Sequence, residues 1–198
     1  MKRGLIYGLL MSMAIGFYSC KQKSPYRKMV DEQMATGQRY DSLFLGLYIG
    51  MSRQDFYTQC WEMNHKGLLK HGSKNSTAEY AMKDELPFKA RMNFYPNFYE
   101  EKIFEMPTYF SYTAWAPWNK RLWADSLRTD VVNLFKDWYG EERWIETTHP
   151  KYGIAHVKVD GNRRISIYAE NEEYVKVNFV DMSQEKEARK ALELAKKE

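Results

Sequence analysis

Alternating apolar and polar residues between positions 154 and 180 constrain the fold more than any other feature of this sequence. Three alternating segments follow one another, separated by the turn residues Asp160-Gly161-Asn162 and Asn171-Glu172. A period of two is typical of strands with one buried face, and Asp-Gly between such segments is typical of a hairpin. The sequence therefore predicts consecutive antiparallel strands whose core face carries Ala155, Val157, Val159, Ile165, Ile167, Val175, Val177 and Phe179.

The first half of the chain predicts a similar run of strands. Segments 77–83, 88–95, 99–106 and 108–116 are rich in aromatic and apolar residues, which favour strands. Pro107 and Pro117 follow the last two segments. Because proline has no N–H for a sheet ladder, we expect a strand to end at each of them.

Each run of strands follows a predicted amphipathic helix. Ser52 resembles an N-cap, because Asp55 follows it at the position of a capping box. The first helix places an apolar face inward and ends near Gly67, and the second begins at Asp125 or Ser126 and ends at Gly140. The inward residues of the first are Phe56, Cys60 and Met63, and those of the second are Leu127, Val131, Leu134, Phe135 and Trp138.

This order of elements predicts an α+β fold, a two-layer sandwich of an antiparallel meander sheet with helices. We expect a tandem of two helix-plus-meander units, over residues 46–116 and 117–181. A polar helix over residues 182–198 should follow, stabilised by i,i+4 pairs of opposite charge. These pairs are Glu185 with Arg189 and Glu193 with Lys197.

The composition excludes several other classes of protein. The chain has 6 Trp, 15 Tyr and 10 Phe. These aromatic side chains provide far more buriable apolar surface than disordered chains carry. Two cysteines are too few for a disulfide scaffold, and a mean hydropathy of −0.67 is too low for a polytopic membrane protein. A net charge of +4 does not indicate a nucleic-acid partner.

The first twenty residues carry a targeting signal. Lys2 and Arg3 precede an uncharged apolar run over residues 4–17, which has the length of a signal-peptide core. The run leads to Ser19-Cys20, which resembles a bacterial lipobox, although the residues at 17 and 18 depart from the usual pattern. That resemblance implies a signal peptide over 1–19 and acylation of Cys20. An ordinary signal peptide or an uncleaved anchor is the alternative.

A lipid on Cys20 implies a protein attached to the bacterial cell envelope, because several acyl chains together give firm membrane binding. Residues 20–45 are then a lipidated tether, basic over 21–27, and an N-terminal helix over 29–40 interrupted at Gly37. Lys21, where inner-membrane lipoproteins carry aspartate, favours the outer membrane facing the periplasm. The chain is similar in character to uncharacterised lipoproteins of gut anaerobes.

A second resemblance lies at the start of the first predicted helix. Residues 50–56 (GMSRQDF) resemble the helix start of small outer-membrane-assembly lipoproteins and of the tandem β-lactamase-inhibitor-protein fold. The second half of the chain lacks this Gly-Met-Ser. The resemblance implies protein–protein binding on the concave face of the sheet rather than catalysis.

Residues that could carry chemistry do not form a recognised pattern. Cys60 shares a helix face with apolar residues, where cysteine acts as a small hydrophobe. The histidines His65, His71, His149 and His156 have no metal-ligand spacing. No nucleophile-elbow, phosphate-loop, dinucleotide or zinc-protease motif is present. We therefore expect no catalytic residue, metal or cofactor.

The unusual feature is a dense aromatic segment over residues 94–118. Exposed rings can anchor a protein partner or stack on sugars, whereas strands use other rings in the core. A loop around Pro117 should expose two tryptophans beside two cations, which suits an anionic or hydroxylated partner. The candidate binding residues are Tyr112, Trp115, Trp118, Lys120 and Arg121.

These observations together predict a lipid-anchored envelope protein of unknown specific activity. A module that binds another envelope protein is the first hypothesis. A glycan-binding accessory protein that uses exposed aromatic rings is the alternative, and a hydrolase is the least favoured. A protein-binding site should be a contiguous apolar patch with a polar rim, whereas a hydrolase needs a deep pocket with perturbed titratable groups.

Overall fold

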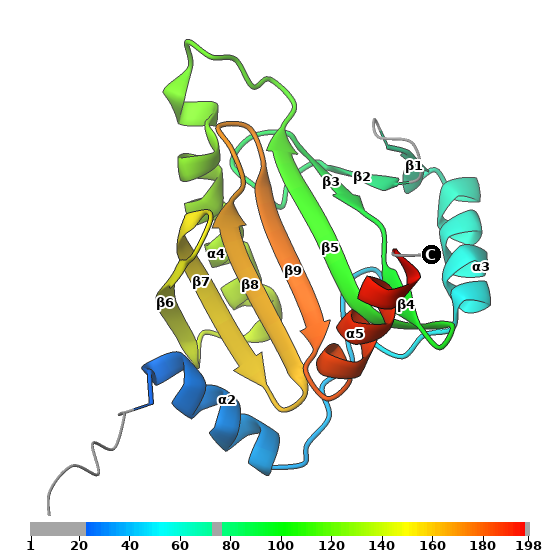
Figure 1. Cartoon of the computed structure of the whole chain (residues 1–198). Coiled ribbons are helices and arrows are strands. Elements are labelled where there is room, and N and C mark those ends of the chain that lie inside the picture. Colours follow the sequence, from blue (N-terminus) through cyan, green and yellow to red (C-terminus); the bar gives the residue numbers. More distant parts are fainter. Residues whose placement is uncertain (1–22, 73–76, 197–198) are drawn as a thin grey trace, which may run out of the picture.

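The computed structural model describes residues 23–72 and 77–196 and contains one antiparallel sheet with helices around it (Figure 1). Residues 1–19 and Cys20, the expected signal peptide and lipidation site, lie outside the described residues. In chain order the elements are α2 (Pro25–Ala35), α3 (Arg53–His65), β1 (Leu69–His71), β2 (Ala78–Met82), β3 (Ala90–Phe94), β4 (Asn97–Tyr99), β5 (Lys102–Tyr112), η1 (Lys120–Leu122), α4 (Ala124–Tyr139), β6 (Trp144–His149), β7 (Gly153–Asp160), β8 (Arg163–Ala169), β9 (Val175–Asp181) and α5 (Glu185–Ala195).

The nine described strands form one continuous sheet in the order β1-β2-β3-β5-β9-β8-β7-β6, with β4 also paired to β5. The strands of the first half occupy one side, those of the second half the other, and β5 pairs with β9 in the middle. The predicted α+β fold, an antiparallel sheet packed against helices, is confirmed. A tandem of two units stays a prediction, because this pairing merges both halves into one sheet.

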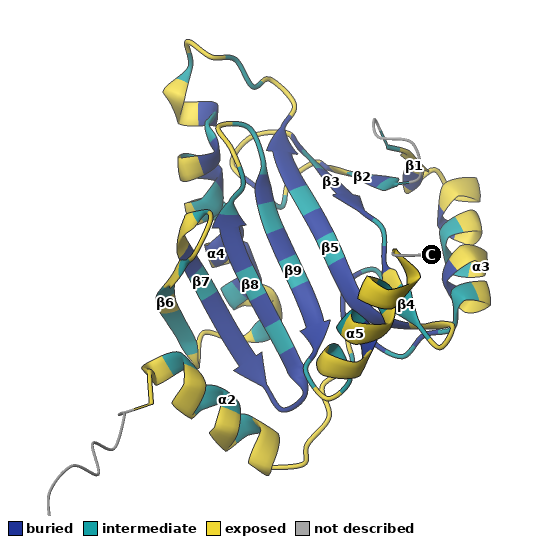
Figure 2. Ribbon diagram, viewed as in Figure 1, coloured by how far each residue is buried: buried dark blue, intermediate teal, exposed yellow. Residues whose placement is uncertain are grey.

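The helices cover the two faces of the sheet unequally. In Figure 1, α4 packs behind the sheet, whereas α2 and α5 lie in front of its lower end. A single hydrophobic cluster joins α3 and α4 to the sheet, and its aromatic centre includes Phe110, Phe135 and Phe179. The central strands are accordingly the most buried elements in Figure 2.

The predicted C-terminal hairpin is present, but its faces differ from the expectation. Asp160 pairs with Arg163, so the turn consists of two residues, and Ile165 lies opposite Lys158. The register therefore places Ile165 and Ile167 on the face opposite to Ala155, Val157 and Val159. A one-residue change in register reverses every side chain. Both sets are nevertheless buried, since helices lie over both faces at this end of the sheet.

Pro107 does not end a strand, contrary to the prediction. Strand β5 runs without interruption through it, and Pro107 pairs with Asn178 of β9. On the other side of β5 the partner strand changes at this point. Strand β4 pairs with β5 as far as Glu105, and β3 pairs with β5 from Thr108 onward. On that side of β5 no described residue pairs with Pro107, so the proline lies where the ladder is already interrupted.

The helix boundaries follow the local signals in part. Ser52 caps α3, and the Asp55 N–H donates to its Oγ (3.1 Å), as predicted. Helix α2 begins at Pro25 within the expected tether, because Ser24 supplies an N-cap and proline suits the first helical turn. Helix α4 begins one residue before Asp125 and ends, as predicted, at Gly140, whose φ is +86°.

The polar C-terminal helix is shorter than expected. It begins at Glu185 and ends at Ala195. The predicted pair of Glu185 with Arg189 is present at 2.8 Å, and Arg189 also contacts Glu105 of β5 at 3.0 Å. The second predicted pair of this helix, Glu193 with Lys197, includes a residue that lies outside the described residues.

Candidate functional site

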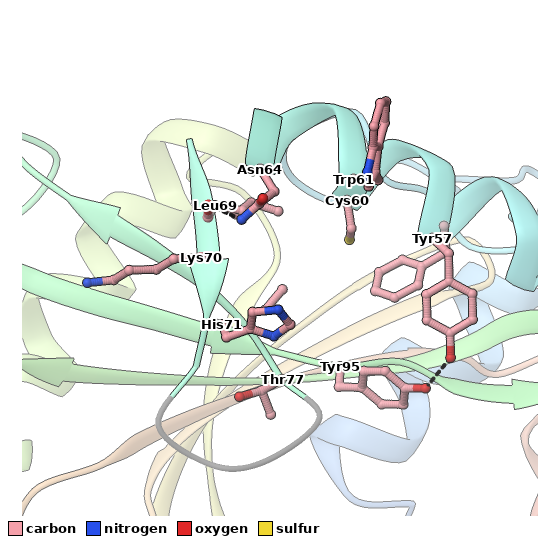
Figure 3. A pocket seen from close by; sticks show the side chains of 11 residues that line it. Tyr57, Cys60, Trp61, Asn64, Leu69, Lys70, His71, Thr77 and Tyr95 are labelled. Atoms are coloured by element: carbon pink, nitrogen blue, oxygen red, sulfur yellow. Dashed lines mark hydrogen bonds between the residues drawn. The ribbon is translucent and has the colours of Figure 1, made fainter. Parts of the chain in front are cut away.

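An apolar groove of about 390 Å³ lies between α3 and the strands β1 and β2 (Figure 3). Its lining combines aromatic and small apolar side chains with polar groups: Phe56, Tyr57, Cys60, Trp61, Asn64, Leu69, Lys70, His71, Thr77, Ala78 and Tyr95. An apolar concavity with polar groups at its margin has the composition of a site that accepts an apolar side chain.

Helix α3 positions the groove through two adjacent rows of side chains. Phe56 and Met63 are 2% and 6% exposed and attach the helix to the core. One position further round the helix, Tyr57 and Trp61 turn outward and are 47% and 68% exposed. The Tyr57 hydroxyl lies 2.6 Å from that of Tyr95, which closes one end of the groove (Figure 3).

Trp61 is held in place at the rim. Its ring stacks on that of His65, one helical turn later, with centroids 5.7 Å apart and an interplanar angle of 5°. The stacking limits the rotamers of the indole, so less side-chain entropy is lost when a partner covers it.

The opposite wall of the groove is the outermost strand of the sheet. The Gly72 N–H donates to the Thr77 carbonyl (2.9 Å), and hydrogen-bonded pairs alternate along an antiparallel ladder. The backbone groups of Leu69 and His71 therefore point away from β2. Consistently, the Leu69 carbonyl accepts a hydrogen bond from Asn64 Nδ2 (2.8 Å).

Cys60 and His71 line this groove together, but they do not form a nucleophile and base. No hydrogen bond or ion pair joins the two side chains in the part of the chain that the structure describes. Burial raises the pKa of the Cys60 thiol to about 11, which keeps it protonated at neutral pH. The thiol therefore serves as apolar lining, as its helix face indicated.

The structure separates the binding residues that the sequence grouped around Pro117. Trp118 is 85% exposed, and Lys120 and Arg121 are also at the surface. Trp115 is half-buried, and its Nε1 donates to the Glu172 carbonyl (3.1 Å).

The prediction of Tyr112 as a binding residue was wrong, since Tyr112 is fully buried at the end of β5 and offers no surface to a partner. It packs edge-on against Phe88, and its hydroxyl donates to Asp130 of α4. It therefore links the sheet to α4.

The groove itself was missed by the sequence analysis. A signal for it was present in α3, where Tyr57 and Trp61 stand next to the apolar positions Phe56 and Cys60. Two adjacent rows of apolar side chains make the apolar stripe of the helix wider than a single packing face requires. No local sequence pattern indicated that β1 forms a wall of the groove. The strand has only three residues, too few to show an alternation of apolar and polar side chains.

The described residues contain neither a metal-ion cluster nor a membrane-spanning helix. Within 23–72 and 77–196, no cluster of three or more His, Cys, Asp and Glu side chains is placed to hold a metal ion. No helix in these ranges has the length and apolar character needed to cross a bilayer. Comparisons of the chain with protein-family models, curated proteins and solved structures each gave no significant match.

Proposed function

We propose that this chain is a lipid-anchored protein of the bacterial cell envelope that binds a partner protein through the groove beside α3. The observation that carries the proposal is the groove itself, with Trp61 two-thirds exposed at its rim. Tryptophan and tyrosine are the residues most often found to dominate binding energy at protein interfaces. The protonated Cys60 thiol, which no hydrogen bond joins to His71 among the described residues, favours binding over catalysis.

The occupant we propose is an extended segment of the partner. His71 directs its backbone groups to the outer edge of β1 and also lines the groove, whereas the Leu69 carbonyl at this edge already accepts a hydrogen bond from Asn64. A segment that pairs with this edge can gain main-chain hydrogen bonds there and place an apolar side chain under α3. The short edge strand itself limits indiscriminate pairing, since it presents only three residues.

Replacing Trp61 by alanine should weaken partner binding about tenfold or more, because it removes the most exposed ring of the groove. The measurement is a mild-detergent capture from native membranes, with copurified proteins quantified by mass spectrometry. Trp118→Ala, which removes an exposed tryptophan from the loop near Pro117, is the matched control. Both rings are outside the core, so neither variant should change the thermal unfolding midpoint appreciably.

The pattern of losses decides among the hypotheses. A partner lost with Trp61→Ala and retained with Trp118→Ala supports the groove. Loss only with Trp118→Ala would move the site to the loop, and equal capture by all three proteins would refute both sites. A capture without any partner, together with binding on a glycan array, would replace this proposal by the glycan-binding alternative.

Cys20→Ala should move the protein from the membrane fraction to the soluble fraction, because it removes the acylated side chain expected from the lipobox resemblance. Incorporation of labelled palmitate into wild-type protein, and its loss in the variant, is the direct measurement. Cys60→Ala is the control, since it removes the other cysteine and should leave labelling intact. A variant that stays in the membrane, with an unlabelled wild type, would contradict lipid anchoring.

A further inference from the structure

A pocket of about 340 Å³ lies on the front face of the sheet, between the helices α2 and α5 (Figure 1). Its lining comes from both of these helices and from the strands β6, β7, β8 and β9. It shares no lining residue with the groove beside α3, and the exposed Trp118 of the loop near Pro117 lies outside it. The pocket is therefore a separate site.

Small side chains on neighbouring strands make the floor of this pocket. Val157, Ser166 and Asn178 lie directly opposite one another across β7, β8 and β9, so they project from the same face of the sheet. The next row contains Ala155, which lies opposite Tyr168. Because Ala155, Val157 and Ser166 have short side chains, they leave a hollow between the two helices.

The walls of the pocket are held in place by contacts within the protein. The Arg164 guanidinium donates to the Tyr26 hydroxyl of α2 (3.0 Å) and to the Glu185 carboxylate of α5 (2.7 Å), and so joins the two helices. At the other end of the pocket, the rings of His149 and Tyr168 stack with their centroids 4.6 Å apart. A pocket fixed before its ligand enters loses less entropy on binding.

The charged side chains that line the pocket, Arg164 and Arg189, are both paired. Both contact Glu185, at 2.7 and 2.8 Å, and Arg189 also contacts Glu105 at 3.0 Å. Burial alone would raise the pKa of Glu105, but hydrogen bonds from two asparagines and the charge of Arg189 lower it, so this carboxylate is ionised at neutral pH. Two cations thus face two carboxylates, and the pocket offers a charged ligand no unpaired counterion.

Neutral polar groups of the lining remain free for a ligand. Ser166 and Thr147 are half-buried, and within the described residues their hydroxyls make no hydrogen bond. His149 Nδ1 accepts from the backbone N–H groups of Lys151 (3.2 Å) and Tyr152 (3.3 Å), so the neutral ring carries its proton on Nε2 and can donate there. None of these three groups is enclosed, so a ligand can reach them.

We propose that this pocket binds a neutral pyranose sugar. The sugar hydroxyls exchange hydrogen bonds with Ser166 and Thr147 and accept one from His149 Nε2, and the apolar side of the sugar ring lies against the Tyr26 ring. A sugar carries many hydroxyl groups on a rigid, uncharged ring, which matches a polar lining whose charges are already paired.

The sugar can be free or the terminal residue of a glycan, since the two share this chemistry. The proposal does not depend on the groove beside α3, because the two sites have no lining residue in common. Either site can therefore fail without the other.

Ligand-detected NMR titration of the purified full chain, in a detergent without a sugar headgroup, tests the proposal. The probes are methyl glucoside, methyl galactoside, methyl mannoside and N-acetylglucosamine, of which at least one should bind saturably in about the millimolar range. The uronic acid and the amino sugar of the same configuration should bind at least about threefold more weakly, because their charges lose hydration without gaining a partner. The corresponding disaccharide distinguishes a glycan end from a free sugar.

Ser166→Leu is the decisive variant, because it extends an apolar side chain into the pocket from its floor and should abolish binding of the sugar. Ser166→Ala removes only the hydroxyl and should weaken binding about threefold or more, the effect of one neutral hydrogen bond. Ser126→Ala is the matched control, since this half-buried serine of α4 lies outside the pocket and its loss should leave the affinity unchanged.

Thermal unfolding of each variant shows whether it is folded. Loss of binding in a folded Ser166→Leu protein supports the site, and if that variant does not fold, the affinity of Ser166→Ala decides. The proposal is overturned by any of three results: no saturable binding of the four neutral sugars, tighter binding of the charged analogues, or unchanged affinity in both Ser166 variants.

Discussion

Asp160→Asn is expected to lower the free energy of unfolding by about 3–5 kcal/mol, the cost of breaking a buried charge cluster by removing one partner. The substitution keeps the shape of the side chain but removes the carboxylate that faces Arg143, Lys158 and Arg163. The side chains of Lys158 and Arg163 are 1% and 6% exposed, so water cannot replace the lost charge. Denaturant-induced unfolding measures the difference.

Asp125→Asn is the matched control for this loss. Asp125 also pairs with an arginine, Arg128, at 3.1 Å, but its side chain is 79% exposed. Exposed ion pairs contribute about 0–1 kcal/mol, so this variant should be nearly neutral. A similar small effect for Asp160→Asn would show that the buried cations do not depend on the carboxylate.

The effect of Asp160→Asn should also depend on pH, through Lys158. Burial lowers the pKa of Lys158 in the folded protein, so between the folded and unfolded pKa values the unfolded chain binds more protons. Stability therefore rises with pH in that window. Without Asp160 the folded pKa falls further, and the destabilisation should shrink as the pH rises toward about 10, the ordinary range for lysine.

Gly161→Ala is expected to destabilise the protein by about 3 kcal/mol, from a left-handed backbone and a steric overlap together. Gly161 has a φ of +50° in the β7–β8 turn, and an added Cβ would lie 2.1 Å from the backbone oxygen of Gln38. Backbone cannot move aside as the end of a side chain can. The turn also receives the segment after α2, because the Tyr40 N–H donates to Asn162 Oδ1 (2.7 Å).

Gly153→Ala separates the two causes. Gly153 has a φ of +74°, but an added Cβ there would meet nothing within 4 Å. It should therefore cost only the backbone term, about 1–2 kcal/mol. Equal losses in the two variants, measured by denaturant-induced unfolding, would show that the segment after α2 moves away from the turn without cost.

Gly161 shows which features of the fold a local sequence pattern can predict. A turn with positive φ at Gly161 could be expected from Asp-Gly between two alternating segments. The close approach of Gln38 could not be expected, because it joins residues more than a hundred positions apart. The sequence pattern also did not determine the length of the turn, which has two residues rather than the expected three. That one-residue difference reversed the predicted face of Ile165 and Ile167.

The candidate sites likewise depend partly on local sequence patterns and partly on tertiary packing. Periodicity identified α3 and its inward face, yet Tyr57 and Trp61 form a groove rim only because the fold places β1 and β2 beside the helix. Tyr112 and Trp118 belong to one aromatic segment, but one is fully buried and the other 85% exposed. Both side chains are aromatic, so residue class alone does not separate them, and the contact of Tyr112 with α4 decides its burial.

By itself the sequence determined the α+β class, the antiparallel hairpins, the cap at Ser52 and the helix end at Gly140. These features depend on hydrogen bonds and side-chain periods within a few neighbouring residues. Only the tertiary structure decided the pairing of β5 with β9, the position of Pro107 between two partners and the two pockets. Those depend on contacts between distant segments, whose free energy comes from burial and which no local pattern encodes.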